Sequence, residues 1–146
     1  MINLKKFISI NSDLALFAFD IRKKVFVQEQ HVRAEDEFDE FEKFSQHYLA
    51  FHDGTPVGTA RWRHTQNGIK LERFAVLEEF RSKKIGHCIL KEILKDVVPF
   101  RKRIYLHAQL PAVKFYKRQK FIEEGEIFHE CNIAHYTMNY MGKTKK

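Results

Sequence analysis

A short basic stretch, Arg81 to Gly86, has the composition of a site for a polyanionic ligand. It follows an apolar run that ends at Val76 and leads into a segment whose apolar residues recur every three or four positions. The N-terminus of a helix carries unpaired backbone N–H groups and the positive end of the helix dipole, so a tight loop that feeds it can bind a pyrophosphate. Arg81, Lys83 and Lys84 would add charge there. The stretch predicts a phosphate site, although a solvated basic helix start has the same composition.

The elements that would position this loop follow from turn signals and apolar spacing. Asp-Gly at residues 53–54 and Asn-Gly at residues 67–68 separate apolar runs, which is typical of β-hairpins. The order β-α-β-β-β-α-β-α-β-β predicts an α/β or mixed α+β sheet with helices on its faces. We expect strands over residues 2–10, 47–52, 57–64, 69–76, 103–108, 126–131 and 135–140, and helices over 11–28, 81–99 and 111–119.

Length and composition indicate one globular domain over residues 1–146. Hydrophobic residues make up 44% of the chain and charged residues 31%, which is unlike a disordered or fibrous protein. No apolar run approaches the roughly 20 residues that span a bilayer, and the first ten residues lack a signal-peptide core. We therefore expect a cytoplasmic protein that does not enter a membrane, with Cys88 and Cys131 as reduced core thiols.

The net charge of +7 fits either a nucleic acid or a small polyanion as partner. The basic residues are spread along the chain, and the one pure cluster is formed by the terminal lysines, Lys143, Lys145 and Lys146. A nucleic-acid surface would need a basic stripe with exposed aromatic residues, whereas the phenylalanines near the basic loop are expected in the core. We therefore expect no nucleic-acid partner. The histidines show no paired helical spacing, so no metal site is expected either.

Residues 31–46 are strongly acidic and carry Phe38, Phe41 and Phe44 between the carboxylates. The simpler interpretation is a solvated loop or short helix whose phenylalanines pack into the core. The alternative is a lip over a substrate pocket, where the carboxylates would attract a cationic amine.

Several short motifs together resemble those of the GNAT acetyltransferases, and within them the ElaA-like subgroup. The resemblance covers about Phe19 to Met138. It implies a mostly antiparallel, twisted sheet of about seven strands flanked by helices, with two splayed strands that hold acyl-CoA. The motifs are residues 25–30, the spacing of Glu37, Asp39 and His47, residues 58–61, 107–109 and 125–126, and Glu130 to His135 with Met138.

The same resemblance implies an acetyl-CoA site. Arg81 and Gly86 match the family's loop pattern, which is Gln or Arg, two residues, Gly or Ala, one residue, Gly. Lys84 stands where most relatives carry Gly or Ala, and a positive φ there would cost about 1 kcal/mol or more. Lys120 and Asn132 also replace glycines of the family. The residues implied for acetyl-CoA are Phe74, Ala75, Val76, Arg81, Ser82, Lys83, Lys84, Ile85, Gly86, Gln109, Ala112 and Phe115.

The implied reaction is direct attack of a primary amine on acetyl-CoA, without a covalent enzyme intermediate. Tyr116 holds the position of the family's general acid, and a phenol can donate a proton to the departing thiolate. Glu72 is our first choice for the general base, because a period of two places it on the same sheet face as Val76. His107 is the next choice, since its ordinary pKa suits proton transfer at neutral pH.

The alternatives that stay open concern the base, the acceptor and catalysis itself. Glu29, Glu130 and His135 also remain candidates for the base. The acceptor could be a small molecule or a peptide amine, and a homodimer is possible because many GNAT enzymes dimerise. The competing function is a non-catalytic acyl-CoA-binding regulatory or interaction module on the same fold.

Overall fold

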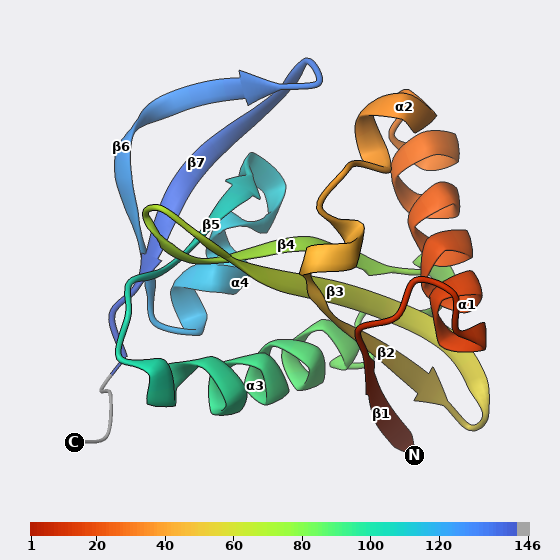
Figure 1. Cartoon of the computed structure of the whole chain (residues 1–146). Helices are drawn as coiled ribbons and strands as arrows, with labels where there is room; N and C mark the ends of the chain where they lie inside the picture. The colour runs from red at the N-terminus through yellow and green to blue at the C-terminus, as the bar shows by residue number, and fades with distance from the viewer. Residues whose placement is uncertain (143–146) are drawn as a thin grey trace.

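The computed structural model describes residues 1–142, so the predicted lysine cluster at residues 143–146 lies outside the described residues. Seven strands form one sheet in the order β1-β2-β3-β4-β5-β7-β6. Every neighbouring pair is antiparallel except β4 and β5, which are parallel. The prediction of a mostly antiparallel sheet of about seven strands with flanking helices is confirmed (Figure 1).

The helices and strands follow one another in the predicted order, and their observed bounds differ from the predicted bounds mainly at the ends of elements. The strands are β1 (Ile2–Phe7), β2 (Gln46–His52), β3 (Thr55–Thr65), β4 (Gly68–Val76), β5 (Ile104–Gln109), β6 (Phe121–Glu130) and β7 (Ile133–Tyr140). The helices are α1 (Asp13–Arg22), α2 (Ala34–Glu37), α3 (Ile85–Val97) and α4 (Val113–Arg118). Within residues 1–142 no helix is long and apolar enough to cross a membrane.

The predicted helix over residues 11–28 is divided into two types of helix. Ser12 caps α1 by accepting a hydrogen bond from the N–H of Ala15, and after Arg22 the chain continues as a π-helix, Lys23–Glu29. A π-helix inserts residues relative to an α-helix and often lies beside a functional site. Apolar periodicity predicted that Val25 faces the core, which it does, but gave no sign of the change in helix type.

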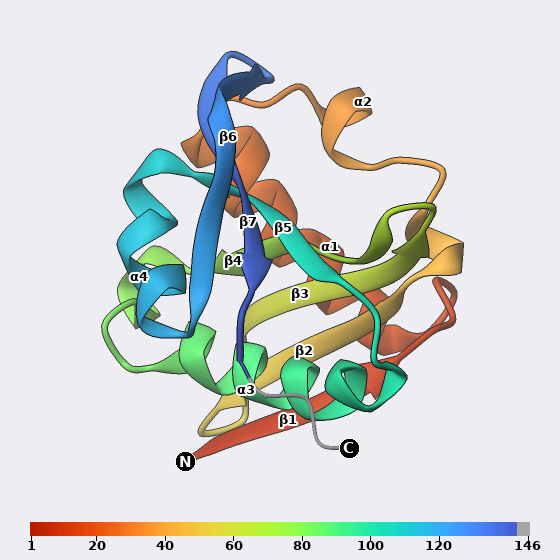
Figure 2. The same ribbon diagram turned by 90° about the vertical axis from the view of Figure 1, so that its left-hand side faces the viewer.

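Two apolar cores lie on opposite faces of the sheet, one under α3 and one under α1 (Figures 1 and 2). Five α3 side chains, Ile85, Ile89, Leu90, Ile93 and Val97, are buried in the first core. Each such burial contributes about 1.5–3 kcal/mol. A Cβ on Gly58 of β3 would lie 2.9 Å from Cγ2 of Ile85, so a glycine there lets the first turn of α3 approach the sheet.

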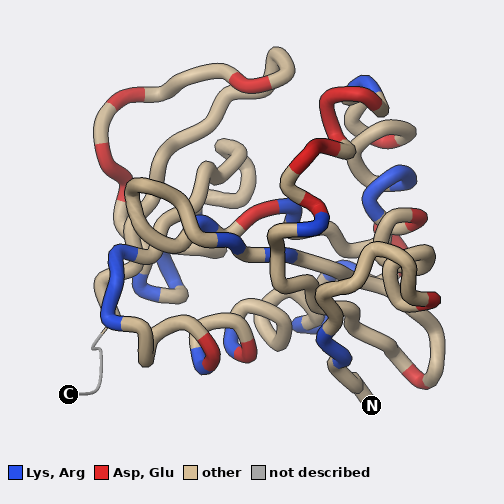
Figure 3. Tube along the Cα trace, viewed as in Figure 1, with Lys and Arg blue, Asp and Glu red and all other residues tan. Residues whose placement is uncertain are grey.

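The acidic segment supplies counterions to buried arginines. Arg61 of β3 is 0% exposed and contacts Asp39 at 2.9 Å, Glu42 at 2.8 Å and Glu72 at 2.9 Å. Arg22 of α1 is also buried and binds Glu42 and Glu37. Figure 3 shows the acidic run around α2 above the basic residues of the sheet.

These ion pairs bear on both interpretations of residues 31–46. Three of the six carboxylates, those of Glu37, Asp39 and Glu42, pair with arginines of the interior, whereas Glu35, Asp36 and Glu40 are exposed. Asp36 lines the larger cavity described below, so a substrate lip remains an open alternative. Phe38 and Phe41 are half-buried, whereas Phe44 is 68% exposed, so the prediction that all three pack into the core is wrong for Phe44.

Arg61→Leu should lower the free energy of unfolding by about 3–5 kcal/mol, because it removes a fully buried cation that three carboxylates share. Urea unfolding followed by circular dichroism measures this change. The matched control is Arg33→Leu, since Arg33 is 70% exposed and pairs with Asp36 at the surface; it should have little effect. If both substitutions changed the free energy of unfolding by the same small amount, the buried network would not contribute to stability as expected.

Candidate active site

The parallel strands β4 and β5 pair only over a short length and then separate. Their paired residues are Ile69 with Ile104, Lys70 with Tyr105, and Leu71 with Leu106. Beyond these pairs β4 stays with β3 as far as Val76, and β5 stays with β7 as far as Gln109. The two arrows therefore point apart in Figure 1, which is the splay that the resemblance implied.

A bulge in β4 decides which side chains face this splay. Arg73 has a φ of 60°, and the β3–β4 register shifts between Thr59 and Arg61. As a result, Leu71 and Val76 both pack into the core under α3. A regular alternation would place them on opposite faces. The prediction that Glu72 shares a face with Val76 is therefore wrong, and its reason is the extra residue in the bulge.

The backbone of β4 beyond the bulge turns hydrogen-bonding groups toward the splay. The N–H of Leu77 donates to the Val57 carbonyl of β3 at 2.9 Å. Because successive residues of a strand direct their polar groups to opposite edges, the N–H and carbonyl of Val76 point away from β3. The same alternation applies to Phe74. This edge of β4 can receive an extended, amide-containing ligand.

Two adjoining cavities follow the splay. The larger, of about 900 Å³, lies between β4, β5 and the π-helix, and the smaller, of about 580 Å³, lies at the N-terminus of α3. Val76, Arg81, Gly86 and Phe115 line both, so they form one groove. Of the predicted cofactor residues, Phe74, Ala75, Gln109 and Ala112 line the larger cavity, Ser82, Lys84 and Ile85 line the smaller, and Lys83 lines neither.

The loop before α3 has an unusual backbone. Ser82 has a φ of 69° and Lys84 a φ of 65°, so the left-handed conformation considered for Lys84 is present without glycine. Lys84 accepts the first helical bond, from the N–H of Cys88 at 3.0 Å. The N–H groups of Ile85, Gly86 and His87 therefore have no acceptor within the helix and remain for a ligand. Lys120 and Asn132, at the other two glycine positions of the family, also have positive φ, 72° and 62°.

Tyr116 lies on α4 at the inner wall of the larger cavity. Its ring packs against Phe74 and Phe115 at centroid distances of 5.8 and 5.0 Å. Burial raises the pKa of the phenol, so it stays protonated at neutral pH. Within residues 1–142 the Tyr116 hydroxyl has no hydrogen-bond partner. Every fully buried polar side-chain atom in these residues does have a partner, so the Tyr116 hydroxyl is not fully buried. The hydroxyl therefore reaches the cavity.

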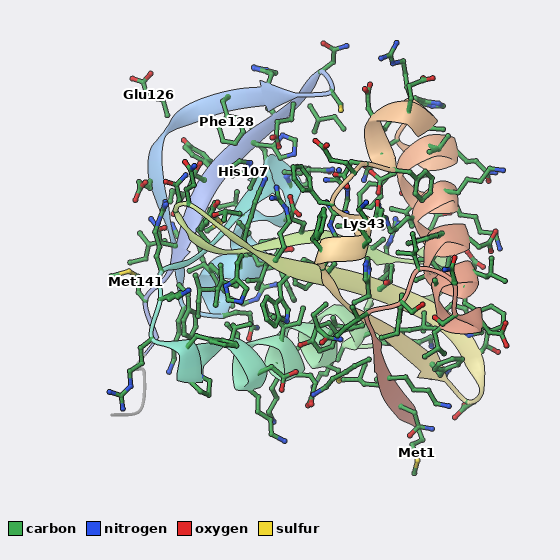
Figure 4. All side chains as sticks on the ribbon, in the orientation of Figure 1. Met1, Lys43, His107, Glu126, Phe128 and Met141 are labelled. Atoms are coloured by element: carbon green, nitrogen blue, oxygen red, sulfur yellow. The ribbon has the colours of Figure 1, made fainter. Side chains whose placement is uncertain are left out.

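His107 lies on β5 and lines the same cavity. Its Nδ1 is 3.2 Å from Oε2 of Glu130 on β6, and its ring packs edge-on against Phe128 (Figure 4). The hydrogen bond with His107 lowers the pKa of Glu130. If Nδ1 carries the proton, Nε2 is an acceptor. His135 of β7 also lies near Glu130, with its Nε2 at 3.8 Å from Oε1 of Glu130 and its Nδ1 at 2.7 Å from the Ile133 carbonyl.

Glu72 also lines the cavity but is surrounded by cations. It contacts Arg61 at 2.9 Å, Arg63 at 2.8 Å and Lys70 at 3.1 Å. Burial alone would raise its pKa, but these hydrogen bonds and charges outweigh burial and lower the pKa to about 2. A carboxylate with such a low pKa is a poor acceptor for a proton from an ammonium group. Its contacts favour a structural role.

Sequence reasoning did not find three features of this site. The Arg73 bulge had no sequence signal, because a positive φ at arginine is rare. The ion pairs of Arg61 could not be predicted, because their partners are brought to Arg61 only by the tertiary fold. Cys131, predicted as a core thiol, is exposed at the β6–β7 turn and lines the cavity, because the turn places it outside both cores. Within residues 1–142 no group of side chains forms a metal site.

Comparisons with known proteins agree with this fold and groove. The sequence profile of the "Acetyltransferase (GNAT) domain" matches residues 12–141. The "Uncharacterized N-acetyltransferase YjcF" of Bacillus subtilis is 38% identical over 138 residues, which cover 92% of this chain and 98% of YjcF. These matches define an acyltransferase, and the chain belongs to the GNAT acetyltransferase family.

Solved structures support the same fold at lower sequence identity. Escherichia coli ElaA superposes with a TM-score of 0.84 at 24% identity, over 96% of this chain and 99% of ElaA. PaiA N-acetyltransferase from Thermoplasma acidophilum, solved in complex with coenzyme A, superposes with a TM-score of 0.69 at 19% identity, over 96% and 98% of the two chains. These likenesses concern the fold.

Lys84→Gly should raise the free energy of unfolding by up to about 1 kcal/mol, because glycine removes the left-handed strain at this residue. Lys83→Gly is the matched control, because Lys83 has no positive φ; it should lower the free energy of unfolding by about 0.5–1 kcal/mol. Chemical denaturation of both variants measures the difference. The same loss in both would show that residue 84 is not strained.

Proposed function

We propose that this protein transfers the acetyl group of acetyl-CoA to a primary amine by direct attack. The observation that carries the proposal is the groove itself, which runs from the unpaired edge of β4 to the free N–H groups of α3. An extended amide chain attached to a pyrophosphate matches both ends of such a groove. Coenzyme A has this chemistry, and the related fold of PaiA was solved with it.

Acetyl-CoA would bind with its pyrophosphate at Ile85 to His87 and its pantetheine along Phe74 to Val76. The backbone N–H groups of β4 would then donate to pantetheine amides and to the thioester oxygen, where negative charge develops during attack. Gly86 lines both cavities, and a Cβ there would lie 3.7 Å from Cζ of Phe115, so a larger side chain would narrow this approach. The cofactor supplies the activated acetyl group, and the chain supplies its position.

The proposed acid and base approach the splay from opposite faces of β5. Leu106 and Ala108 belong to the core under α3, together with Tyr116. His107 lies between them in the strand and so points to the opposite face. In the tetrahedral intermediate the attacking nitrogen and the departing sulfur are different substituents of one carbon, so a base and an acid on different sides of β5 can each serve one of them.

In the proposed reaction His107, Tyr116 and Glu130 each have one role. Nε2 of His107 takes a proton from the ammonium group, and the neutral nitrogen attacks the thioester carbonyl carbon. The C–S bond then breaks, Tyr116 gives its proton to the thiolate, and the phenolate recovers a proton from the newly acylated nitrogen. Glu130 holds the His107 ring in the tautomer with a free Nε2. Each proton transfer contributes roughly 10²- to 10⁴-fold.

His107 replaces Glu72 as our choice for the base because of their different surroundings. Three cations compensate Glu72, whereas His107 has one carboxylate partner and an open nitrogen. We propose that Glu72 instead holds the bulged strand against Arg61. Glu29, another open candidate, forms a bidentate pair with Arg81 and is not free to act as a base.

Acetyl-CoA binding should be lost in Gly86→Asp, because the added carboxylate would lie in the proposed pyrophosphate site. Titration calorimetry with acetyl-CoA measures this, and Asn67→Asp at the exposed β3–β4 turn controls for the added charge. Equal binding by Gly86→Asp and the wild type would contradict the cofactor site. Binding without thiol release across a panel of primary amines would instead favour the non-catalytic acyl-CoA module.

His107→Gln should lower kcat about 10²-fold or more while the KM for acetyl-CoA stays nearly constant. Raising the pH should restore part of the loss, because more of the amine is then neutral without a base. Tyr116→Phe should lower kcat without this recovery. His129→Gln is the control, since His129 is exposed on β6 outside both cavities. A less than twofold change in His107→Gln would exclude His107 as the base.

A further inference from the structure

Arg81 does not have a free side chain in the cofactor groove. Its Nη1 and Nη2 donate to the two carboxylate oxygens of Glu29 at 2.7 and 2.8 Å, and its Nε donates to the Val76 carbonyl at 3.0 Å. Each of the three guanidinium nitrogens thus already makes one hydrogen bond within the chain. The hydrogen bond with Arg81 also lowers the pKa of Glu29, so the carboxylate is charged at neutral pH.

The negative charge of Glu29 lies beside the proposed pyrophosphate site, where it is unfavourable for binding of an anion. A carboxylate beside a pyrophosphate site repels the ligand, and Arg81 would attract phosphate more strongly without it. An arginine that served only as a phosphate ligand would therefore work better without Glu29. The bidentate geometry instead indicates an arginine whose task is to fix two segments of the chain.

Glu29 and its neighbour connect the end of the π-helix to both walls of the groove. Glu29 reaches Arg81, which follows β4, while Oε1 of Gln30 accepts a hydrogen bond from Nε2 of Gln109 on β5 at 2.8 Å. The π-helix itself ends with a bond from the N–H of Gln30 to the Val25 carbonyl at 3.1 Å. The segment therefore spans the gap that opens where β4 and β5 separate.

We propose that Glu29 is a positioning residue of the cofactor site, which acts through Arg81. Its carboxylate fixes the guanidinium, the guanidinium fixes the Val76 carbonyl, and the N–H of Val76 and the loop before α3 are thereby held for the pantetheine and the pyrophosphate. Arg81 thus contributes to binding by holding the loop rather than by contacting phosphate. This inference rests on the proposed binding of acetyl-CoA.

Titration calorimetry of the full chain with CoA tests the proposal through Glu29→Gln. We expect CoA affinity to fall about three- to tenfold, because a neutral amide cannot form the same bidentate pair. The matched control is Glu79→Gln, which removes one exposed negative charge near Arg81 without breaking a hydrogen bond; its affinity should stay equal or rise slightly. Thermal unfolding of each variant checks that the fold is retained.

A double-mutant cycle separates positioning from direct phosphate contact. Arg81→Ala and the double variant with Glu29→Gln should bind CoA within about twofold of each other, since both break the same pair. In Glu29→Gln, the KM for acetyl-CoA should rise while kcat changes little. Equal or higher CoA affinity in Glu29→Gln, with wild-type binding intact, would overturn the positioning role and leave the proposed function standing. A wild type that binds no CoA would overturn both.

Discussion

The separation of β4 from β5 is the constraint on which the rest of the site depends. Strands buried inside a sheet normally satisfy each other's backbone groups, and polar backbone groups without partners are costly. Here the pairing stops after Leu71 and Leu106, although each strand continues with its other neighbour. The open edge of β4 therefore lies inside the molecule, where water or an amide-containing ligand has to satisfy it. The helices and ion pairs around it keep this gap open.

Apolar packing and buried ion pairs hold the strands on either side of the gap in position. On one face, α3 packs through five buried apolar side chains and places its N-terminus at the end of the groove. On the other face, Arg61 and its carboxylates fix β3 against the bulged strand β4. Apolar burial thus sets the position of the α3 N-terminus, while the charges set the position of the bulge. We propose that the buried network holds the strand in place and does not supply the catalytic carboxylate.

The sequence predicted the elements and their order because their signals are local. The Asp53-Gly54 turn, the apolar stripe of α3 and the basic loop are each contained within a few residues. The resemblance to the GNAT family added the splay, which no local pattern contains. It also placed Tyr116 and the loop residues, of which all but Lys83 line the groove.

The sequence could not predict the features that arise from long-range geometry. The face of Glu72 depended on a bulge at Arg73, and a positive φ at arginine leaves no mark in the sequence. The cations around Glu72 come from the neighbouring strand as well as from its own, so its low pKa is a property of the fold. The pair of His107 and Glu130 joins residues 23 positions apart and became visible only through the pairing of β5, β7 and β6.

Backbone amide resonances provide the most direct test of the central claim that acyl-CoA binds in the gap between β4 and β5. Titration of the isotopically labelled protein with acetyl-CoA would be followed by ¹H–¹⁵N correlation spectra. We expect the largest shifts at the amides of Val76, Ile85 and Gly86, with little change at Ala50 in the buried part of β2. Absence of shifts at these three amides, or shifts centred on another part of the sheet, would contradict it.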